Sequence, residues 1–440
     1  MFNKKSKILL SASAALLIAS AAQGAGFSLI ENSASGMGTA FASGGAAGED
    51  AATMWFNPAS MTLLKGQNMM MGLHYVAPQD DFTNQGSTNA DGSALSGPNS
   101  EGGKPAVIPN FYYTGQVTDT LFLGVGINVP FGMGTEYDDG WVGRYHAVET
   151  ELMTININPA IAYKINDQWS IGGGLNIQYV DLTLTSAIDF GALAAHPGAA
   201  DGFADLQADN ADDISFGWNI GVLYELSKST RFSLAYRSSI THDAKGDADF
   251  SVPYSTSTAA IVSTGAFTDT GVHASVELPA SASFSVFHSF NETFDLMADV
   301  TWTQWSVFDE LVIHYDNPAQ PDSVTTENYQ DQWRLALGGN YHVNQDLTLR
   351  AGLAYDEKAV QDKYHRTPRI PDNDRTWVSL GMGYRFSEMI GMDLGYAHLF
   401  VDDVPIENTY ESSQPALNHT LKGEFDASVD IFSAQLTLKF

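Results

Sequence analysis

Histidine, serine and carboxylate side chains are the groups in this sequence that could carry out acid–base, nucleophilic or metal chemistry. The chain has 11 histidines, among them His74, His146, His365 and His398. A hydrolase would need one of them beside a serine or an aspartate, and a metal site would need two at ligand spacing with a glutamate. We find neither a Gly-x-Ser-x-Gly turn nor a metal-spaced histidine pair. The sequence therefore predicts no catalytic residue, no metal site and no cofactor, so the protein is not expected to be an enzyme.

The amino-terminal residues are typical of an export signal. Three lysines within residues 4–7 precede an apolar run at residues 8–19, and small residues follow as far as a cleavage position before Ala25. The run is too short to span a membrane comfortably. We predict that residues 1–24 are a signal peptide.

Charge and cysteine content exclude some partners and some means of stabilisation. The chain has 21 basic and 51 acidic residues, and loss of the three signal-peptide lysines changes the net charge from −30 to −33. A chain this acidic would repel nucleic acid. It has no cysteine, so an exported protein of this sequence needs a large core or a closed hydrogen-bonded framework instead of disulfides.

Apolar and polar residues alternate with a period of two along much of the chain. In residues 432–440 every second residue is apolar, and the same pattern recurs at residues 333–341, 347–355 and 378–386. The pattern fits a soluble sandwich, whose apolar face covers a core. It fits equally an outer-membrane barrel, whose apolar face contacts lipid while polar residues line the lumen.

Short and long connections alternate strictly, which favours the barrel. One strand before the first turn, near residues 68–76, and one after the last, near residues 425–440, bring the count to fourteen. Aromatic residues flank the turns, as an interfacial girdle requires. We predict an all-β protein, a transmembrane antiparallel β-barrel of about 14 strands formed by residues 66–440 in the bacterial outer membrane. The tight turns that join its strands in pairs are Thr118-Asp119, Asn166-Asp167, Ser227-Lys228, Asn291-Glu292, Asn344-Gln345 and Ser387-Glu388.

Residues 25–65 lack this alternation and consist mainly of small residues, with Trp55 and Phe56 among them. Fourteen strands enclose a lumen wider than their own side chains fill. A segment of this length could fold into the lumen as an amino-terminal hatch, or plug. A disordered periplasmic tail is the alternative, against which the two aromatic residues argue.

Several motifs occur in one order along the chain that remains after cleavage: Ala25-Gly26-Phe27-Ser28-Leu29, Ser35-Gly36-Met37-Gly38 with Ala40, Asn57-Pro58-Ala59, Gly217-Trp218-Asn219, Tyr236-Arg237-Ser238 and Ile370-Pro371-Asp372-Asn373-Asp374-Arg375. In these motifs the chain resembles the FadL family of outer-membrane transporters for long-chain fatty acids and other hydrophobic compounds. The resemblance implies a hatch that carries Asn57, Pro58 and Ala59. It also implies passive passage triggered by movement of the extreme amino terminus, where Phe27 would touch the ligand.

The third predicted strand, residues 121–129, runs into Pro130-Phe131-Gly132-Met133-Gly134. Proline cannot donate to a ladder and glycine weakens one, so from spacing alone the strand could simply end here. Members of the FadL family kink this strand inward and leave a hole in the wall. The resemblance therefore implies that ligand exits sideways into the membrane past Pro130, Phe131, Gly132 and Gly134.

Two predicted outer loops, after the fifth and seventh strands, contain apolar residues that are unusual in solvated loops. An exposed apolar surface of this kind suggests a ligand groove, although small local loop cores are an alternative. The resemblance implies that ligand is captured between these loops. The residues are Phe190, Leu193, Phe203 and Leu206 in the first loop and Ile261, Val262 and Phe267 in the second.

The charge pattern leaves the chemical nature of the ligand open. Fatty-acid members of the family meet the carboxylate with lumenal lysine or arginine, whereas this chain has Asp181 and Val312 where basic residues are expected. Acidic pairs in or beside the outer loops would also repel a carboxylate. We expect passive uptake of long-chain fatty acids or similar molecules, with neutral or aromatic hydrocarbons as the alternative. The remaining lumenal cations are Arg237, Arg334, Arg350 and Arg385, and the acidic pairs are Asp80-Asp81, Asp138-Asp139, Asp212-Asp213 and Asp402-Asp403.

Two other classes of barrel are less consistent with the sequence. A general porin would need no glycine-rich hatch, and an outer-membrane hydrolase would need catalytic groups that are not found. The expected partners are hydrophobic small molecules together with the lipid and lipopolysaccharide of the outer membrane. Nothing in the sequence indicates a trimer, so a monomer is expected.

Overall fold

The computed structural model describes residues 26–42, 44–208 and 214–440. The predicted signal peptide, residues 1–24, and the acidic pair Asp212-Asp213 lie outside the described residues. Strands make up most of the regular structure. Among the described helices, none has both the length and the apolar composition needed to cross a membrane.

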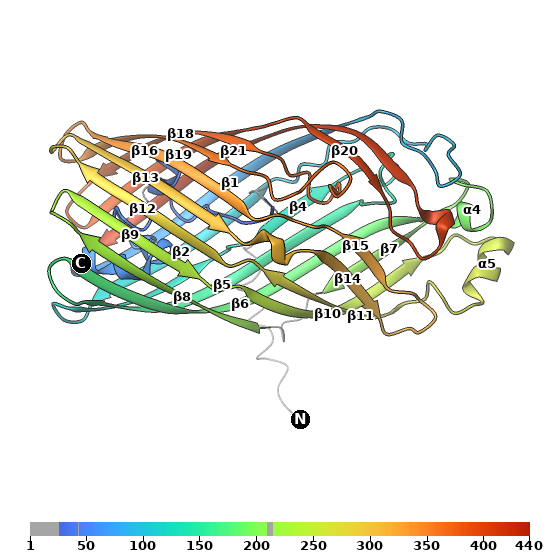
Figure 1. Ribbon diagram of the computed structural model, residues 1–440, viewed down its shortest axis with the longest axis horizontal. Helices are drawn as coiled ribbons and strands as arrows, with labels where there is room; N and C mark the ends of the chain where they lie inside the picture. The colour runs from blue at the N-terminus through green and yellow to red at the C-terminus, as the bar shows by residue number, and fades with distance from the viewer. Residues whose placement is uncertain (1–25, 43, 209–213) are drawn as a thin grey trace, which may run out of the picture.

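Fourteen antiparallel strands form a closed barrel, which confirms the predicted fold class (Figure 1). The last strand, β21 (Thr420–Lys439), pairs with the first, β1 (Gln67–Asn84), from Asn68↔Lys439 to Asn84↔Gly423. Closure joins the first and last strands, which would otherwise each present an unpaired edge that hydrocarbon could not solvate. The strands between them are β2 (Ala106–Gln116), β3 (Leu121–Asn128), β5 (Glu149–Lys164), β6 (Trp169–Asp189), β8 (Ile214–Glu225), β9 (Thr230–Arg237), β12 (Ser281–Ser289), β13 (Phe294–Thr303), β16 (Gln332–His342), β17 (Leu347–Asp356), β18 (Arg375–Arg385) and β19 (Ile390–Val401).

The six predicted turns join successive strands at one end of the barrel, which is also the end where the chain terminates (Figure 1). Asparagine side chains close several of them. The Oδ1 atom of Asn166 accepts from the backbone N–H groups of Gln168 and Trp169, both at 2.9 Å, and Asn291 and Asn344 make the same contacts in their own turns. These contacts mimic a backbone turn and are local in sequence, so the turns were predictable.

Many of the long connections are not loops throughout, because they continue the wall as strands at the opposite end. Alternation persists there: in β10, Ile240, His242 and Ala244 are buried while Thr241 and Asp243 are exposed. This end also carries short helices (Figure 1). The additional elements are β7 (Asp201–Ala208), β10 (Ile240–Ser251), β11 (Thr270–Leu278), β14 (Glu310–Tyr315), β15 (Ser323–Thr326), β20 (Val404–Thr409), α4 (Phe190–Leu193), α5 (Thr256–Val262), η2 (Trp305–Val307) and η3 (Pro415–Leu417).

The alternation places apolar residues on the outside of the barrel and polar residues inside. Along β18, Val378 and Leu380 are 39% and 58% exposed, whereas Ser379 between them is 1% exposed. A sheet surrounded by water would show the reverse pattern. Exposed aromatic residues such as Trp169 and Phe386 lie next to the short turns. This is the outer surface of a barrel that contacts lipid, as expected for an outer-membrane protein.

Residues 26–42 and 44–65, called the N-terminal segment below, lie within the barrel lumen. The segment contains α2 (Ala34–Gly38), α3 (Thr53–Phe56) and η1 (Pro58–Leu63). Helix α2 contacts β17, β18, β19 and β21, while η1 contacts β3, β5, β6 and β8 on the other side of the barrel. A tail outside the barrel could not touch both walls, so these contacts argue against the disordered tail.

Glycines at inward-facing positions of the wall let the N-terminal segment approach closely. A Cβ atom added to Gly352 in β17 would lie 2.1 Å from the carbonyl carbon of Thr39, and one added to Gly381 in β18 would lie 2.6 Å from the Cα atom of Gly38. These neighbours are backbone atoms, so no side-chain rotation could relieve the overlap. A side chain at either position must displace the segment or the strand.

We predict that Gly352→Leu displaces the N-terminal segment and opens an ion path through the barrel. In planar bilayers the wild-type protein should stay close to the baseline current, and the variant should show discrete open-channel steps. Gly391→Leu is the control, because the nearest atom to a Cβ there is 3.8 Å away. A closed Gly352→Leu channel would contradict the view that the segment blocks the lumen.

Candidate functional site

The Asn57-Pro58-Ala59 motif attaches the N-terminal segment to the wall. Asn57 is fully buried and extended (φ −151°, ψ 113°), the conformation that a following proline favours. Its Oδ1 atom accepts from the N–H of Ala59 at 2.8 Å and caps η1. Its Nδ2 atom donates to the carbonyl of Val222 in β8 at 2.9 Å and to the hydroxyl of Ser233 in β9 at 2.7 Å. One side chain thus fixes both the helix start and its place on the wall.

The third strand is interrupted at Pro130 and then resumes. Strand β3 pairs with β5 as far as Asn128↔Asn156, and β4 (Gly132–Glu136) resumes the pairing at Gly132↔Met153. Three residues of the interrupted strand therefore face two residues of β5, which is a bulge. The alternative that the strand simply ends is not what the structure shows.

The same interruption breaks the ladder on the other side of the strand. Pairing between β2 and β3 stops at Phe111↔Ile127, so residues 106–110 of β2 pair with β1 but not with β3. Gly134 lies in β4 and pairs with Glu151 of β5, not with β2. Residues 128–132, called the kink below, therefore border a stretch of wall that lacks regular strand pairing.

The first described residues bond to the inner side of the kink. The N–H of Leu29 donates to the carbonyl of Pro130 at 2.8 Å, and the N–H of Gly132 donates to the carbonyl of Phe27 at 3.0 Å. A Cβ atom at Gly132 would lie 2.9 Å from the Cδ1 atom of Leu29. The amino terminus and the kink are therefore joined by two backbone hydrogen bonds.

An aromatic cluster surrounds Phe27, whose side chain is 1% exposed. Its ring centroid lies 4.6 Å from Trp305, 5.5 Å from Phe308 and 6.2 Å from Phe131, all in edge-to-face geometry. Gly26 has φ +62°, and a Cβ there would lie 2.5 Å from the Trp305 ring, so only glycine fits beside the cluster. Sequence reasoning identified Phe27 and Phe131 but missed Trp305 and Phe308, because no local pattern links η2 to the amino terminus.

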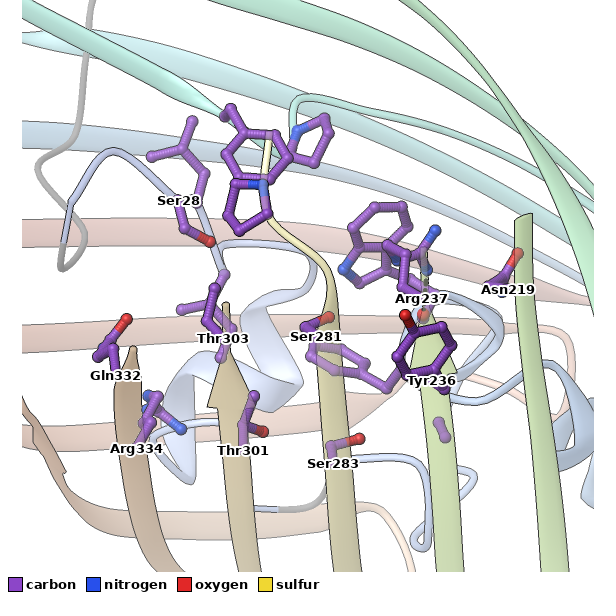
Figure 2. A pocket seen from close by; sticks show the side chains of 18 of the residues that line it. Ser28, Asn219, Tyr236, Arg237, Ser281, Ser283, Thr301, Thr303, Gln332 and Arg334 are labelled. Atoms are coloured by element: carbon purple, nitrogen blue, oxygen red, sulfur yellow. Dashed lines mark hydrogen bonds between the residues drawn. The ribbon is translucent and has the colours of Figure 1, made fainter. Parts of the chain in front are cut away.

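A cavity lies in the lumen beside the kink (Figure 2). Its empty volume is about 1040 Å³, part of it open to solvent. Such a combination of apolar walls and a few polar groups is typical of a ligand pocket. Apolar residues from the N-terminal segment and the wall line the cavity together with hydroxyl, amide and charged groups: Leu29, Ile30, Phe56, Phe131 and Trp377, and Ser28, Asn219, Arg237, Ser281, Ser283, Thr301, Thr303, Gln332, Arg334 and Asp356.

The two arginines of this cavity differ in their charge environment. The Nε atom of Arg334 lies 2.9 Å from the Oδ1 atom of Asp356, so its charge is neutralised. Arg237 stacks on Trp55 with its guanidinium carbon 3.4 Å from a ring centroid, and it donates to the carbonyl of Trp55 at 2.7 Å and to the side chain of Asn176. Among the described residues Arg237 has no ion pair.

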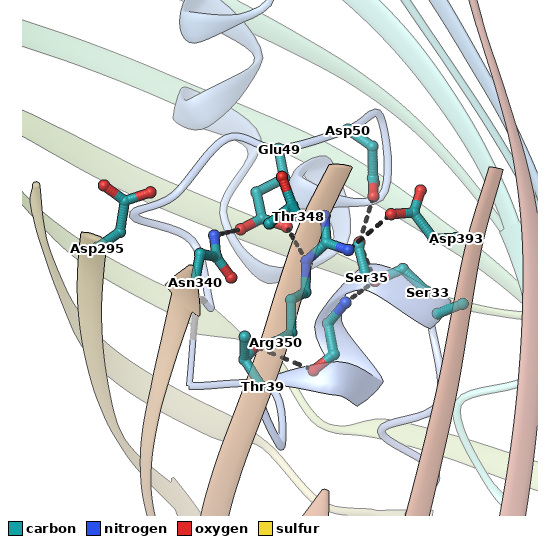
Figure 3. A network of polar contacts seen from close by, with 12 residues as sticks. Ser33, Ser35, Thr39, Glu49, Asp50, Asp295, Asn340, Thr348, Arg350 and Asp393 are labelled. Carbon is teal, nitrogen blue, oxygen red and sulfur yellow. Dashed lines mark hydrogen bonds and ion pairs between the residues drawn. The ribbon is translucent and has the colours of Figure 1, made fainter. Parts of the chain in front are cut away.

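A polar network holds the other half of the N-terminal segment to the wall (Figure 3). Arg350 of β17 forms ion pairs with Asp393 at 2.7 Å and with Glu49 at 3.4 Å. Asp50 accepts from Ser35 at 2.5 Å and from Gln435 of β21 at 2.8 Å. Arg350 is therefore engaged by carboxylates of the segment and of the wall. Arg385 lies exposed near the turns, with its Nε atom 3.3 Å from the Oδ1 atom of Asp346. Neither is free to bind ligand.

The outer connections enclose a second cavity of about 1260 Å³, called the outer pocket below, which is partly open to solvent. Phe190 and Phe267 meet with ring centroids 5.1 Å apart, and Leu193 and Ile261 pack against the same cluster. Phe267 and Leu206 line the pocket itself. The structure thus brings together most of the apolar loop residues that the sequence singled out.

Two of the predicted groove residues lie elsewhere. Phe203 is half-buried in β7 and packs against the separate cluster that contains Trp141 and Phe425. Its neighbours Ala204 and Leu206 point toward the pocket, because residues one apart in a strand face opposite sides. Val262 is half-buried at the end of α5 and does not line the pocket.

Glu327, in the connection between β15 and β16, is 3% exposed. Burial raises the pKa of its carboxyl from 4.5 to about 8. Because the folded-state pKa is the higher one, its contribution to stability is present below about pH 4.5 and is lost as the pH rises through about 8. The carboxyl of Glu327 is therefore protonated more readily in the folded protein than in the unfolded chain.

We predict that Glu327→Gln raises the thermal unfolding temperature relative to wild type at pH 9 and not at pH 5. Circular dichroism melts at these two pH values measure the effect. Glu388→Gln, at an exposed turn position, is the control and should change neither value. Equal unfolding temperatures of Glu327→Gln and wild type at pH 9 would show that the carboxyl is not buried as described.

The chain matches one family of known proteins over most of its length. The family model described as "Outer membrane protein transport protein (OMPP1/FadL/TodX)" matches residues 15–440. The chain is 34% identical to a "47 kDa outer membrane protein" of Pasteurella multocida, with 88% of this chain and 90% of that protein covered. It is 31% identical to a "Long-chain fatty acid transport protein" of Escherichia coli, with 88% and 89% covered.

Solved structures show the same architecture. A crystal structure of a Pseudomonas aeruginosa FadL homologue matches with a TM-score of 0.86 at 27% identity and covers 94% of this chain and 100% of that one. The Pseudomonas putida toluene transporter TodX matches with a TM-score of 0.66 at 18% identity, covering 89% and 94%. At that identity the second match supports the fold alone.

Proposed function

This chain belongs to the OMPP1/FadL/TodX family of outer-membrane transport proteins, and we propose that it takes up long-chain fatty acids or similar hydrophobic molecules passively across the bacterial outer membrane. One observation carries the proposal. The amino terminus, the lumenal cavity and the kink meet at Phe131, which lines the cavity, packs near Phe27 and lies within the kink. A ligand at this point would contact all three.

The proposed route begins at the outer pocket, where an apolar molecule leaves water. It continues through the aromatic cluster around Phe27 to the lumenal cavity. It ends sideways at the kink, beside residues 106–110 of β2, which lack a partner strand on that side. Lateral exit suits an apolar ligand, because it reaches lipid without crossing the aqueous periplasm.

The proposed gate is the movement of residues 26–29. Opening must break the two hydrogen bonds between residues 27–29 and 130–132 and the ring contacts of Phe27, each ring pair being worth about 0.5–1.5 kcal/mol. An apolar ligand can replace the ring contacts, so ligand binding offsets much of this cost. Asn57, Pro58 and Ala59 would hold the rest of the hatch in place meanwhile.

The proposal assigns no catalytic residue and no cofactor to the chain. One relative is a "Long-chain fatty acid transport protein" of Escherichia coli. We propose that the protein works as a monomer surrounded by outer-membrane lipid and lipopolysaccharide. Residues 25–65 act as the hatch and residues 66–440 as the barrel.

Neutral or aromatic hydrocarbons are the second candidate ligands. The observation that favours them is the ion pair of Arg334 with Asp356, which neutralises one lumenal cation. Asp181 and Val312 also supply no positive charge. A neutral ligand would need only the apolar residues of the lumenal cavity.

The experiment is equilibrium binding of oleate and of a neutral hydrocarbon of matched length to the purified protein, together with oleate uptake by cells that lack their own transporter. Saturable oleate binding and restored uptake support the proposal. Binding of the hydrocarbon but not of oleate would show that the substrate is a neutral hydrocarbon and not a fatty acid. Steady ion conductance without ligand binding would indicate a general porin, and ester turnover by the purified protein would indicate a hydrolase.

A further inference from the structure

Two histidines lie side by side on the outside of the barrel, at the end opposite the short turns (Figure 1). His273 of β11 and His314 of β14 are directly opposite residues of an antiparallel pair, with ring centroids 5.0 Å apart and ring planes at 28°. Val272 and Ala274 on either side of His273 are buried, so the imidazole faces outward. Imidazole nitrogens are common ligands of Zn²⁺, Cu²⁺ and Ni²⁺, so the two rings could share one ion.

Carboxylates determine which nitrogen of each ring is available. The Nδ1 atom of His314 lies 2.7 Å from the Oδ2 atom of Asp322. An ionised carboxylate only accepts hydrogen bonds, so this Nδ1 carries the hydrogen and the lone pair of the neutral ring is on Nε2. The Nδ1 atom of His273 lies 3.8 Å from the Oδ1 atom of Asp316, which favours a hydrogen on the same nitrogen. A carboxylate behind the ring is the usual second partner of a metal-binding histidine.

Both Nε2 atoms and the charges around them suit a cation. Among the described residues, hydrogen bonds and ion pairs of the two rings involve Nδ1 and not Nε2. About half of each histidine side chain is exposed, so an ion can reach it from solvent. Lys245, Asp247 and Asp316 line a surface hollow beside His273, and Asp322 lies beside His314. Three carboxylates outweigh one ammonium group, so the local field attracts a cation.

The histidine pair lies at a short junction between two parts of the wall. Strand β11 pairs with β10 over its whole length but with β14 at only two positions, one of which is His273↔His314. The connections beyond these strands are also joined. Asn317 donates through its Nδ2 atom to the carbonyl of Gly265 at 2.8 Å and to the hydroxyl of Thr268 at 3.0 Å. Backbone pairing and these side-chain bonds hold the two histidines together without an ion, so the site is preorganised.

We propose that His273 and His314 bind a divalent transition-metal ion such as Zn²⁺ through their Nε2 atoms. Among the described residues no group of three histidine, cysteine or acidic side chains is arranged to hold a metal ion, so water molecules complete the coordination. The bound ion ties β14 to β11 where their pairing is shortest. Strand β14 supplies Leu311, Ile313 and Tyr315 to the outer pocket, so the ion would also steady one wall of that pocket.

This site goes beyond the proposed function and lies outside the proposed ligand route. The sequence analysis predicted no metal site because it searched for histidines at local ligand spacing. His273 and His314 are far apart in the chain, and only the pairing of β11 with β14 brings them together.

The experiment is calorimetric titration of the purified full-length mature protein with Zn²⁺, without a polyhistidine tag. The wild-type protein should bind one ion at this site. Asp322→Asn should weaken binding by about 10–100-fold, as expected for loss of the carboxylate behind a ligand, and His273→Ala and His314→Ala should each weaken it more. His398→Ala is the matched control, because the Nδ1 atom of His398 also lies 2.9 Å from a carboxylate, that of Asp430, but its ring packs on a phenylalanine instead of a second histidine. This control should bind Zn²⁺ like wild type.

Electron paramagnetic resonance with Cu²⁺ tests whether one ion is shared. The wild-type spectrum should show two nitrogen ligands, and the spectrum of either histidine variant should show fewer. Heat-dependent mobility in gels shows that each variant is a folded barrel. Absence of Zn²⁺ binding to wild type, an unchanged affinity in both histidine variants, or loss in only one of them would overturn the shared site. Oleate binding by the wild-type protein is a separate measurement, so these results leave the proposed function standing.

Discussion

Oleate uptake should stop when cysteines at positions 28 and 131 are oxidised to a disulfide, and it should return when the disulfide is reduced. Ser28 and Phe131 form an antiparallel bridge between the N-terminal segment and the kink. The hydrogen bonds lie on either side of this pair, at Leu29 and Gly132, so it is a non-hydrogen-bonded pair with Cα atoms about 4.5 Å apart. That separation suits a disulfide. The bond would hold closed the contact that the proposed gate must open.

The natural chain has no cysteine, so the Ser28→Cys, Phe131→Cys double variant would contain a single possible disulfide. The reduced variant controls for the lost phenylalanine ring, and the two single variants control for oxidation itself. Heat-dependent mobility in gels shows whether each barrel is folded. Undiminished uptake by the oxidised protein would mean that the amino terminus does not have to leave the kink.

Deletion of Pro130 should also abolish uptake, because it should restore a regular wall. Between Asn128↔Asn156 and Gly132↔Met153 the kinked strand has one residue more than β5. Removal of Pro130 equalises the count and also removes the residue that cannot donate to a ladder. The straightened strand could then pair with residues 106–110 of β2. Uptake is measured with labelled oleate in cells that lack their own transporter.

Oleate binding to the purified deletion variant is the matched measurement. The outer pocket lies at the outer end of the barrel, so binding there should persist while transport is lost. The variant Val129→Ala changes the same stretch without changing its length and should transport normally. Transport by the deletion variant at the wild-type rate would exclude the kink as the exit.

The barrel was predictable because its determinants are local. Alternation along β18 assigned Val378 and Leu380 to the lipid face, and the structure exposes both while burying Ser379. Asparagines such as Asn166 and Asn291 close their own turns through bonds to residues two and three positions ahead. Strand number then follows from the alternation of short and long connections. The sequence analysis did not predict that the long connections continue as strands such as β10 and β11.

The candidate site was less predictable because its contacts join distant parts of the chain. Phe27 was identified through a family motif, whereas its partners Trp305 and Phe308 come from η2 and its flank, for which no local pattern predicts a role.

The central claim is that ligand leaves through the wall at the kink, and photo-crosslinking tests it most directly. Val107 of β2 faces outward beside the interrupted ladder and is 41% exposed, and Leu349 of β17 is similarly exposed, at 43%, elsewhere on the barrel. A photoreactive amino acid at position 107 should capture labelled oleate during uptake, whereas the same group at position 349 should not, and deletion of Pro130 should remove the signal at 107. Capture instead at Met389, which is exposed at the short-turn end, with none at 107, would show that ligand passes straight through the barrel and would contradict lateral exit.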